Sequence, residues 1–474
     1  MYDRIHDLLA TRVPTASLSF LGLGILQAWV SVLQTMFQET LNTSAFTAFG
    51  RASLYVDMGS LPVFLLIAIL ARRIAPLGAH GRVLAGSLAL MYAGNALIAF
   101  AELVPVAPLG TEGLTALPSD TSQLVGLAGL VLAGAGSSLA IICWWELYAV
   151  LNPVEVAFCY GMSWIVRELV VTALSGYEGS YLLFSTLVLP LLSLTMLGAA
   201  HRRARQLDLP PCPSGGAISF PWKPMALIAL YAFTYGCGTW LLRYQDDLSM
   251  HLGMVLPAVL VCASVLFASR HFDFAMVYRI ILPVAIASIL ALLLVQEGSE
   301  GLVTVLVRAS YSSVSLYVSV LLCNLSRRYC ISPAWLFSLF NIVHIVFLGA
   351  GTLTYNALPS LAVVAVLIVC ILFVTFIIVS EPTLNSSWRI VLTRKGTGLG
   401  EEARLELTVD SLARKYELSD RQREILLLLA QGDAPRTLAN KLGVAPGTVK
   451  AHVQHIYKKL GIHSKEELDA LVKG

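Results

Sequence analysis

The chain has 474 residues, of which 57% are hydrophobic and only 13% are charged. Soluble domains carry about 25% charged residues, so an ordinary soluble protein is excluded and most of this chain does not face water. The formal net charge of +3 is too small to indicate a partner by itself. The eight cysteines contain no CxxC pair and no metal-type spacing, so we expect reduced structural thiols, no metal site and no cofactor.

Long apolar runs dominate the first 380 residues. A helix needs about 20 mostly apolar residues to cross a bilayer. The longest polar break, residues 201–216, divides the runs into six and six. We therefore predict an all-α chain, a twelve-helix membrane bundle followed by a small four-helix domain. The predicted spans are 16–37, 53–70, 83–103, 122–149, 156–175, 181–199, 224–242, 251–268, 274–295, 302–323, 334–353 and 360–379.

The loops between these spans differ in charge. If the N-terminus is cytoplasmic, the inner segments hold thirteen Lys and Arg residues, whereas the outer loops hold only Arg51 and Arg243. Positive residues accumulate on the cytoplasmic side of membrane proteins. We therefore expect a multi-pass protein of the cell (inner) membrane, with both the N- and C-termini in the cytoplasm.

Six plus six spans with a basic central loop resemble the major facilitator superfamily, over roughly residues 14–380. The loop LARRIAPLGAHGR, residues 70–82, is similar to a signature of that family through Gly78, Gly81 and Arg82, although the acidic residue of the signature is missing. The resemblance implies a transporter-like fold in which the first, fifth and tenth spans line a central cavity. Because this loop supports the transporter gate, the missing acidic residue argues against transport more than against the fold.

Polar residues within spans are costly in lipid, which makes them candidates for function. Two arginines lie in the fifth and tenth spans, each with hydroxyl groups on the same helix face, and the first span has a polar face of its own. We predict that these groups bind an anionic or phenolic small molecule. The candidates are Arg167, Arg308, Tyr160, Ser163, Ser312, Ser315, Gln27 and Ser31.

An alternative is that these arginines serve folding alone. In that case Arg167 pairs with Glu168 or Glu146, and Arg308 pairs with an acid of the outer leaflet. We interpret two further polar residues, His344 and Asn95, as partners in interhelical hydrogen bonds. Three tryptophans near the expected inner edges of spans are interpreted as interfacial anchors, namely Trp144, Trp145 and Trp222.

After Glu381 the composition changes. Residues 381–408 have little apolar periodicity and are predicted to be a cytoplasmic linker between a membrane sensor domain, residues 1–380, and a soluble helical domain, residues 409–474. A short helix, a tight turn and a longer helix opened by Pro446 predict a helix-turn-helix, whose second helix enters the major groove of DNA. Between 434 and 465 there are six basic and no acidic residues, as expected for a nucleic-acid interface.

In the helix that Pro446 opens, the side opposite the apolar stripe is the predicted DNA-binding surface. Its candidate base contacts are Lys450, Ala451 and Gln454, and its candidate phosphate contacts are Thr448, His452, Lys458 and Lys459. The segments LSDRQREILLLLAQG and TLANKLGVAPGTVKAHVQHIYKKLGIHSKEEL closely resemble the LuxR-type DNA-binding domain. The resemblance implies the same base contacts and pairing through the final helix, hence a homodimer on double-stranded DNA. Departures from the family pattern are Gln422, Thr437 and Ala445.

These features together predict a membrane-bound one-component transcriptional regulator. The membrane bundle is the only sizeable candidate for an input module, and the sequence shows no nucleophile–base pair or phosphate loop, so we expect no enzyme. Two alternatives stay open: a facilitator-type transporter with a fused regulatory DNA-binding tail, and a bundle that is an inert anchor.

Overall fold

The computed structural model describes residues 18–42, 52–103, 119–151, 153–177, 180–204, 222–238, 247–267, 300–329 and 331–357, and in the C-terminal part residues 418–430 and 446–473 with a few isolated neighbours. The regular structure in these ranges is helical. The predicted domain boundaries near residues 380 and 408 lie outside them.

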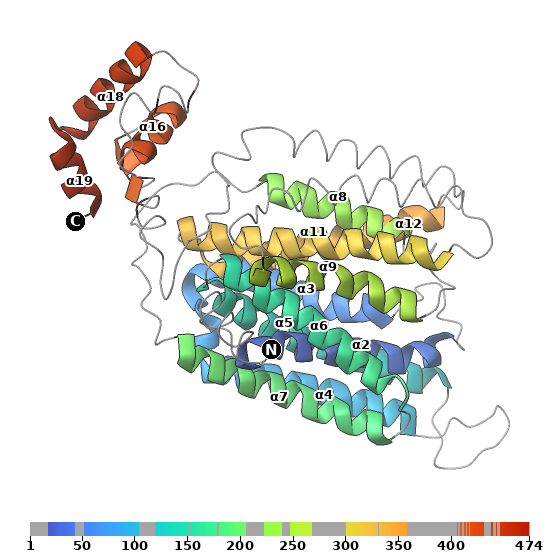
Figure 1. Cartoon of the computed structure of the whole chain (residues 1–474). Coiled ribbons are helices and arrows are strands. Elements are labelled where there is room, and N and C mark those ends of the chain that lie inside the picture. Colours follow the sequence, from blue (N-terminus) through green and yellow to red (C-terminus); the bar gives the residue numbers. More distant parts are fainter. Residues whose placement is uncertain are drawn as a thin grey trace, which may run out of the picture.

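The membrane part is a bundle of helices that run side by side (Figure 1). Eight of its described helices are long and apolar enough to cross a membrane, and α8 and α9 contain shorter apolar stretches. They coincide with predicted spans, whereas the spans predicted at 274–295 and 360–379 lie outside the described residues. The helices are α2 (Gly22–Asn42, after the turn η1, Leu18–Leu21), α3 (Ala52–Ile74), α4 (Gly81–Leu103), α5 (Ser119–Tyr148), α6 (Pro153–Leu174), α7 (Ser180–Ala204), α8 (Trp222–Gly238), α9 (Asp247–Phe267), α11 (Glu300–Tyr329) and α12 (Pro333–Ala357).

Small residues allow these helices to approach closely. A Cβ atom added to Gly59 of α3 would lie 1.9 Å from the carbonyl oxygen of Val131 in α5, and one added to Gly134 of α5 would lie 2.1 Å from that of Val56 in α3. Ser60 donates a hydrogen bond across the same contact, to the carbonyl oxygen of Gly134 at 3.0 Å. Such packing stabilises helices in lipid, where the hydrophobic effect between them is absent.

Two polar residues inside the bundle were predicted to join helices, and the structure confirms both. Asn95 Nδ2 of α4 donates to the carbonyl oxygen of Thr186 in α7 at 2.7 Å. His344 Nε2 of α12 lies 2.6 Å from the hydroxyl of Tyr311 in α11. Each bond satisfies a polar group that lipid could not.

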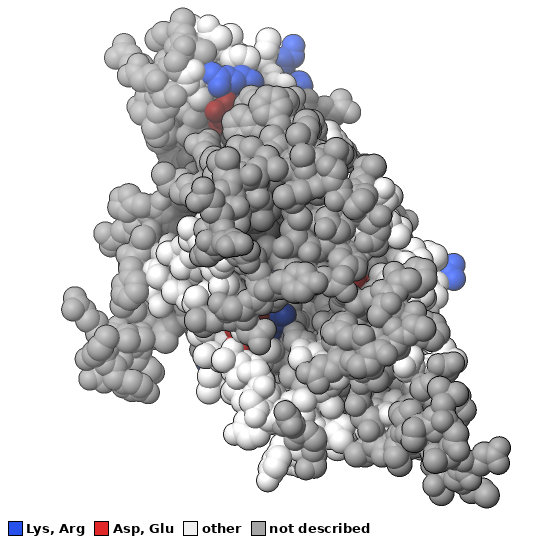
Figure 2. Space-filling model, turned by 90° about the vertical axis from the view of Figure 1, so that its right-hand side faces the viewer, with Lys and Arg blue, Asp and Glu red and all other residues white. Residues whose placement is uncertain are grey.

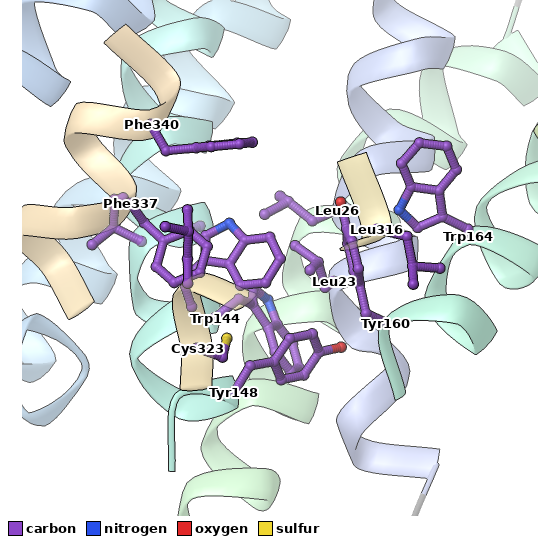
Figure 3. Packing of buried hydrophobic residues seen from close by; sticks show 14 of the residues in the cluster. Leu23, Leu26, Trp144, Tyr148, Tyr160, Trp164, Leu316, Cys323, Phe337 and Phe340 are labelled. Atoms are coloured by element: carbon purple, nitrogen blue, oxygen red, sulfur yellow. The ribbon is translucent and has the colours of Figure 1, made fainter. Parts of the chain in front are cut away.

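The two halves of the bundle meet along α3 with α12 and along α6 with α9 and α11. An aromatic cluster fills the core near this junction (Figure 3). Trp145 stacks on Phe337 of α12 with ring centroids 4.2 Å apart, and Trp144 is fully buried. The prediction that Trp144 and Trp145 are interfacial anchors is therefore wrong, because α5 is enclosed by neighbouring helices where they lie. Trp222 is 52% exposed.

The short loop between α3 and α4, including the turn η3 (Leu77–Ala79), is held by Glu146 of α5. The carboxylate accepts hydrogen bonds from the backbone N–H groups of Leu77 at 2.9 Å and Gly78 at 2.8 Å. His201, in the last turn of α7, lies against Gly78 as well. The loop therefore shares one end of the bundle with the C-terminal ends of α5 and α7, as alternating spans require. Glu146 does not pair with Arg167, which was one option for folding.

The C-terminal part has its own hydrophobic core. Its described helices are α16 (Asp420–Ala430), α18 (Pro446–Leu460) and α19 (Lys465–Lys473). Ile425 and Leu429 of α16 pack with Ile456 of α18 and Leu468 of α19, and these side chains are at most 2% exposed. Of the helix predicted between α16 and α18, only Leu438 and Leu442 are described, both in helical conformation.

Candidate DNA-binding face and intramembrane polar cluster

Helix α16 begins with a capping box. The Ser419 backbone N–H donates to Gln422 Oε1 at 3.1 Å, and the Gln422 N–H donates to Ser419 Oγ at 3.3 Å. Two N–H groups that the first helical turn leaves without partners are satisfied in this way. Gln422 also accepts a hydrogen bond from Lys459 Nζ at 3.4 Å, which ties α18 to the start of α16.

Helix α18 ends in a tight reversal at Gly461. Gly461 has a φ of 69°, in the left-handed region that glycine adopts without strain. The Ile462 N–H then donates to the carbonyl oxygen of Tyr457 at 3.0 Å, the longer bond of a Schellman motif. This reversal brings α19 back against α18. Ser464 caps α19 through a bond from the Glu467 N–H at 3.2 Å.

Burial divides α18 into two sides. Val449 and Ile456 are fully buried and Leu460 is 5% exposed. The residues predicted to contact DNA lie on the remaining surface. Thr448, Lys450, Ala451, Gln454, Lys458 and Lys459 are exposed, and His452 is half-buried. One side of α18 is therefore exposed along the length of the helix, as a helix that enters a DNA groove requires.

Positive charge gathers on this part of the molecule. Figure 2 shows Lys and Arg side chains at the top of the view, at the height at which Figure 1 places the C-terminal helices. Two of the three acidic residues of α19, Glu466 and Glu467, lie in its first turn, at the helix N-terminus. Hydrogen bonds from its own backbone N–H and from Ser464 lower the pKa of Glu466. Burial, together with Asp469 and Glu466, raises the pKa of Tyr457.

Inside the bundle, Arg167 of α6 joins two helices. Its Nη2 donates to Ser31 Oγ of α2 at 2.9 Å, and its Nη1 lies 2.7 Å from Glu168 Oε1. The other carboxylate oxygen of Glu168 pairs with His251 Nδ1 of α9. Arg308 of α11 lies close enough for its charge to act on Glu168. The structure thus gathers residues from both halves into one charged cluster.

The other predicted ligand residues divide between this cluster and the helix contacts around it. Tyr160 lies edge-on to Trp145 and Trp164, within the aromatic core (Figure 3). Ser163 is fully buried, donates to the carbonyl oxygen of Cys159 at 2.8 Å and lies 3.0 Å from the Tyr148 hydroxyl. It therefore serves the contact of α6 with α5.

Three predicted residues remain. Ser312 is buried against α9, and its hydroxyl donates to the carbonyl oxygens of Ala309 at 3.1 Å and Gly253 at 3.4 Å. Ser315 is buried on the same helix beside Tyr160. Gln27, one turn before Ser31, has a buried Oε1 atom with no hydrogen-bond partner among the described residues.

Two charged or titratable groups of this region were missed by sequence reasoning. His251 is the first residue of the predicted span 251–268. Asp57, in α3, is a carboxylate within a span and acts on Tyr311. An ionisable residue inside an apolar run was the available signal for Asp57. For His251 the signal was weaker, because its partner Glu168 is distant in sequence.

Comparison with known proteins separates the two parts of the chain. Residues 416–471 match the family described as "Bacterial regulatory proteins, luxR family". This segment is a LuxR-type DNA-binding domain. It is 51% identical over 51 residues to the oxygen regulatory protein NreC of Staphylococcus aureus, covering 11% of this chain and 24% of NreC. It is 48% identical over 48 residues to "Probable transcriptional regulatory protein NarL" of Mycobacterium tuberculosis, covering 10% and 22%. The chain thus spans about a quarter of these relatives' length.

The bundle is similar in structure to major facilitator proteins. It matches the proton:xylose symporter XylE, bound to 6-bromo-6-deoxy-D-glucose, with a TM-score of 0.55 and 11% identity, over 79% of this chain and 95% of XylE. It matches a bacterial homologue of the iron transporter ferroportin, in its outward-facing state, with a TM-score of 0.53 and 16% identity, over 76% and 96%. At these identities the likeness shows the fold alone. The chain is therefore an all-α membrane protein with a facilitator-like bundle.

The departures of the LuxR-type domain from its family pattern can now be placed. Gln422 keeps both bonds of the capping box, because an amide oxygen accepts the Ser419 N–H as a carboxylate would. Thr437 and Ala445 lie outside the described residues. The LuxR-type domain thus retains its first helix start despite the substitution.

Proposed function

We propose that the protein is a membrane-bound one-component transcriptional regulator. The bundle of residues 1–380 senses a small molecule, residues 381–408 form a linker, and residues 409–474 bind operator DNA with α18 in the major groove. The exposed side of α18, within a LuxR-type domain fused to a facilitator-like bundle, carries this proposal. Lys450, Ala451 and Gln454 read base edges, and Thr448, His452, Lys458 and Lys459 lie toward phosphates.

The proposed topology places both termini in the cytoplasm, where the chromosome is. The charge bias of the loops supports it, whereas the shared end of the bundle at which Gly78, Glu146 and His201 meet supports only the alternation of the spans. The resemblance to LuxR-type domains implies that this domain pairs through its final helix, so it acts as a homodimer on DNA. Labelling of Lys450 from outside intact cells would refute this topology.

The ligand proposed for the bundle is an anionic or phenolic small molecule near Arg167 and Arg308. The inert-anchor alternative makes a different prediction. Replacing residues 1–380 with an unrelated membrane anchor of the same orientation and oligomeric state should abolish the response of a target promoter to its signal, measured with a chromosomal reporter. An unchanged response would mean that the bundle senses nothing.

Transport with a fused regulatory tail is the second candidate, favoured by the fold shared with XylE. One observation weighs against coupled transport. Proton-driven facilitators often carry a mid-membrane carboxylate in the first, fourth, seventh or tenth span. The candidate here, Glu146 of the predicted span 122–149, instead accepts hydrogen bonds from the loop N–H groups of Leu77 and Gly78. Accumulation of a solute in vesicles containing the purified protein, lost in Arg308→Ala, would support transport.

A further inference from the structure

The charged groups of the intramembrane cluster are not all paired among the described residues. Arg167 pairs directly with the carboxylate of Glu168, and Arg308 lies close enough for its charge to act on that carboxylate. That carboxylate uses one oxygen for Arg167 and the other for His251. Asp57 acts on the Tyr311 phenol, and no ion pair joins it to either arginine in the part of the chain that the structure describes.

Arg308 is the group left over. Its Nε atom is buried and has no hydrogen-bond partner, and the described helices bring no carboxylate within ion-pair distance of it. Its stem packs closely on α9, where a Cβ atom added to Gly253 would lie 2.7 Å from the Arg308 Cβ atom. A guanidinium held inside a membrane protein without a counter-ion is costly. An arginine needed only for folding would be expected to have a partner.

We propose that Arg308, supported by Arg167, is the binding site for the carboxylate group of a small organic acid, and that Glu168 is the internal anion with which this ligand competes. The inference rests on the proposed sensing function and names its ligand class. A guanidinium presents its N–H donors in a plane that matches two carboxylate oxygens.

The position of Glu168 links the site to the arrangement of the bundle. Glu168 belongs to α6 of the first half, and its partner His251 belongs to α9 of the second, as Arg308 does to α11. A carboxylate bound at Arg308 competes for Arg167 and weakens this connection between the halves. The ligand therefore shifts the population between two arrangements of the halves, since it binds one of them better.

Thermal unfolding of the purified full-length protein in detergent tests this site without DNA. Acetate and benzoate are the probes, and the neutral benzamide and an equal concentration of chloride are their controls. We expect both carboxylates to raise the unfolding midpoint by about 2 °C or more, and both controls to leave it unchanged. The absence of a shift with either carboxylate would overturn the proposal.

Two variants sharpen the test. Arg308→Gln removes no ion pair, so we expect an unchanged or higher midpoint without carboxylate and no shift with it. Glu168→Gln removes the competing anion and should tighten benzoate binding roughly tenfold or more. Arg202→Gln, an exposed position at the end of α7, should behave as wild type. If Glu168→Gln does not fold, Arg308→Gln alone decides.

The outcomes separate this inference from the proposed function. A wild-type shift retained in Arg308→Gln would overturn the site, even if the reporter still depended on the bundle. A shift lost in Arg308→Gln, with a reporter that ignores replacement of the bundle, would establish the site and refute sensing.

Discussion

Removing the Lys450 side chain tests whether α18 reads DNA. Lys450 is exposed on α18, one residue after the buried Val449, and its ammonium group makes no hydrogen bond or ion pair in the described part of the chain. Lys450→Ala therefore removes a charge without disturbing the core or a cap, and alanine favours the helix. We expect the stability of the domain to be unchanged.

The expected cost appears in binding instead. A good side-chain contact to a base edge contributes about 1–3 kcal/mol of discrimination, which is roughly a 5- to 150-fold change in affinity for the preferred sequence. Lys458→Ala, at an exposed predicted phosphate contact, provides the contrast, because a phosphate contact weakens all sequences alike. It should also reduce the slope of log K against log salt by about one.

The measurement is fluorescence anisotropy with the 404–474 fragment, on an operator obtained by selection from random duplexes and on a scrambled duplex. Lys465→Ala, which removes the same charge from the first turn of α19, serves as the matched control. Lys450→Ala should lose affinity for the operator but not for the scrambled duplex. If it lowers both equally, or neither, α18 does not read bases through Lys450.

Three further predictions concern stability. Ile456→Ala, in the core of the LuxR-type domain, should cost about 2–5 kcal/mol and unfold much of a domain of this size, as circular dichroism of the fragment would show. Gly134→Val should prevent the close contact of α3 with α5 and abolish the monodisperse peak of the full-length protein in size exclusion, whereas Gly198→Ala, with open space around it, should not. The pKa of Glu466 lies below its ordinary value of 4.5, so its contribution to stability is present above that pH and is lost as pH falls through the folded pKa. Glu466→Gln should flatten this acid-side decline in thermal unfolding of the fragment.

Most membrane helices could be predicted from the sequence because the length of an apolar run is a local property of the chain. The spans around Leu26, Met91 and Leu197 coincide with α2, α4 and α7, since about 20 apolar residues in lipid leave the backbone no alternative to a helix. Which neighbouring helices pack around a given helix could not be predicted from the sequence. Trp144 and Trp145 stand where an interfacial anchor would stand, yet α5 is enclosed, and enclosure depends on helices far away in sequence.

The two candidate sites differ in the same way. The proposed DNA-binding side of α18 was predicted from a periodicity within 15 residues, and the structure exposes the residues that this periodicity left outside the apolar stripe. The intramembrane cluster combines α2, α6, α9 and α11, so its pairing required tertiary structure. Sequence left open whether Arg167 pairs with Glu168 or Glu146, and the structure selects Glu168. For Arg308 the described residues provide no such partner.

The separate hydrophobic cores constrain how a signal could travel. The core of the bundle and that of the LuxR-type domain share no residue among those described. The free energy that folds the domain therefore comes from its own side chains, and a ligand in the bundle has no direct means to fold or unfold it. If the bundle senses a ligand, as proposed, control then acts on where the domain is held or on how two domains pair, as a coupling free energy between separate sites. It follows that the released 404–474 fragment should bind DNA with an affinity insensitive to carboxylates, whereas binding by the full-length protein should respond to them.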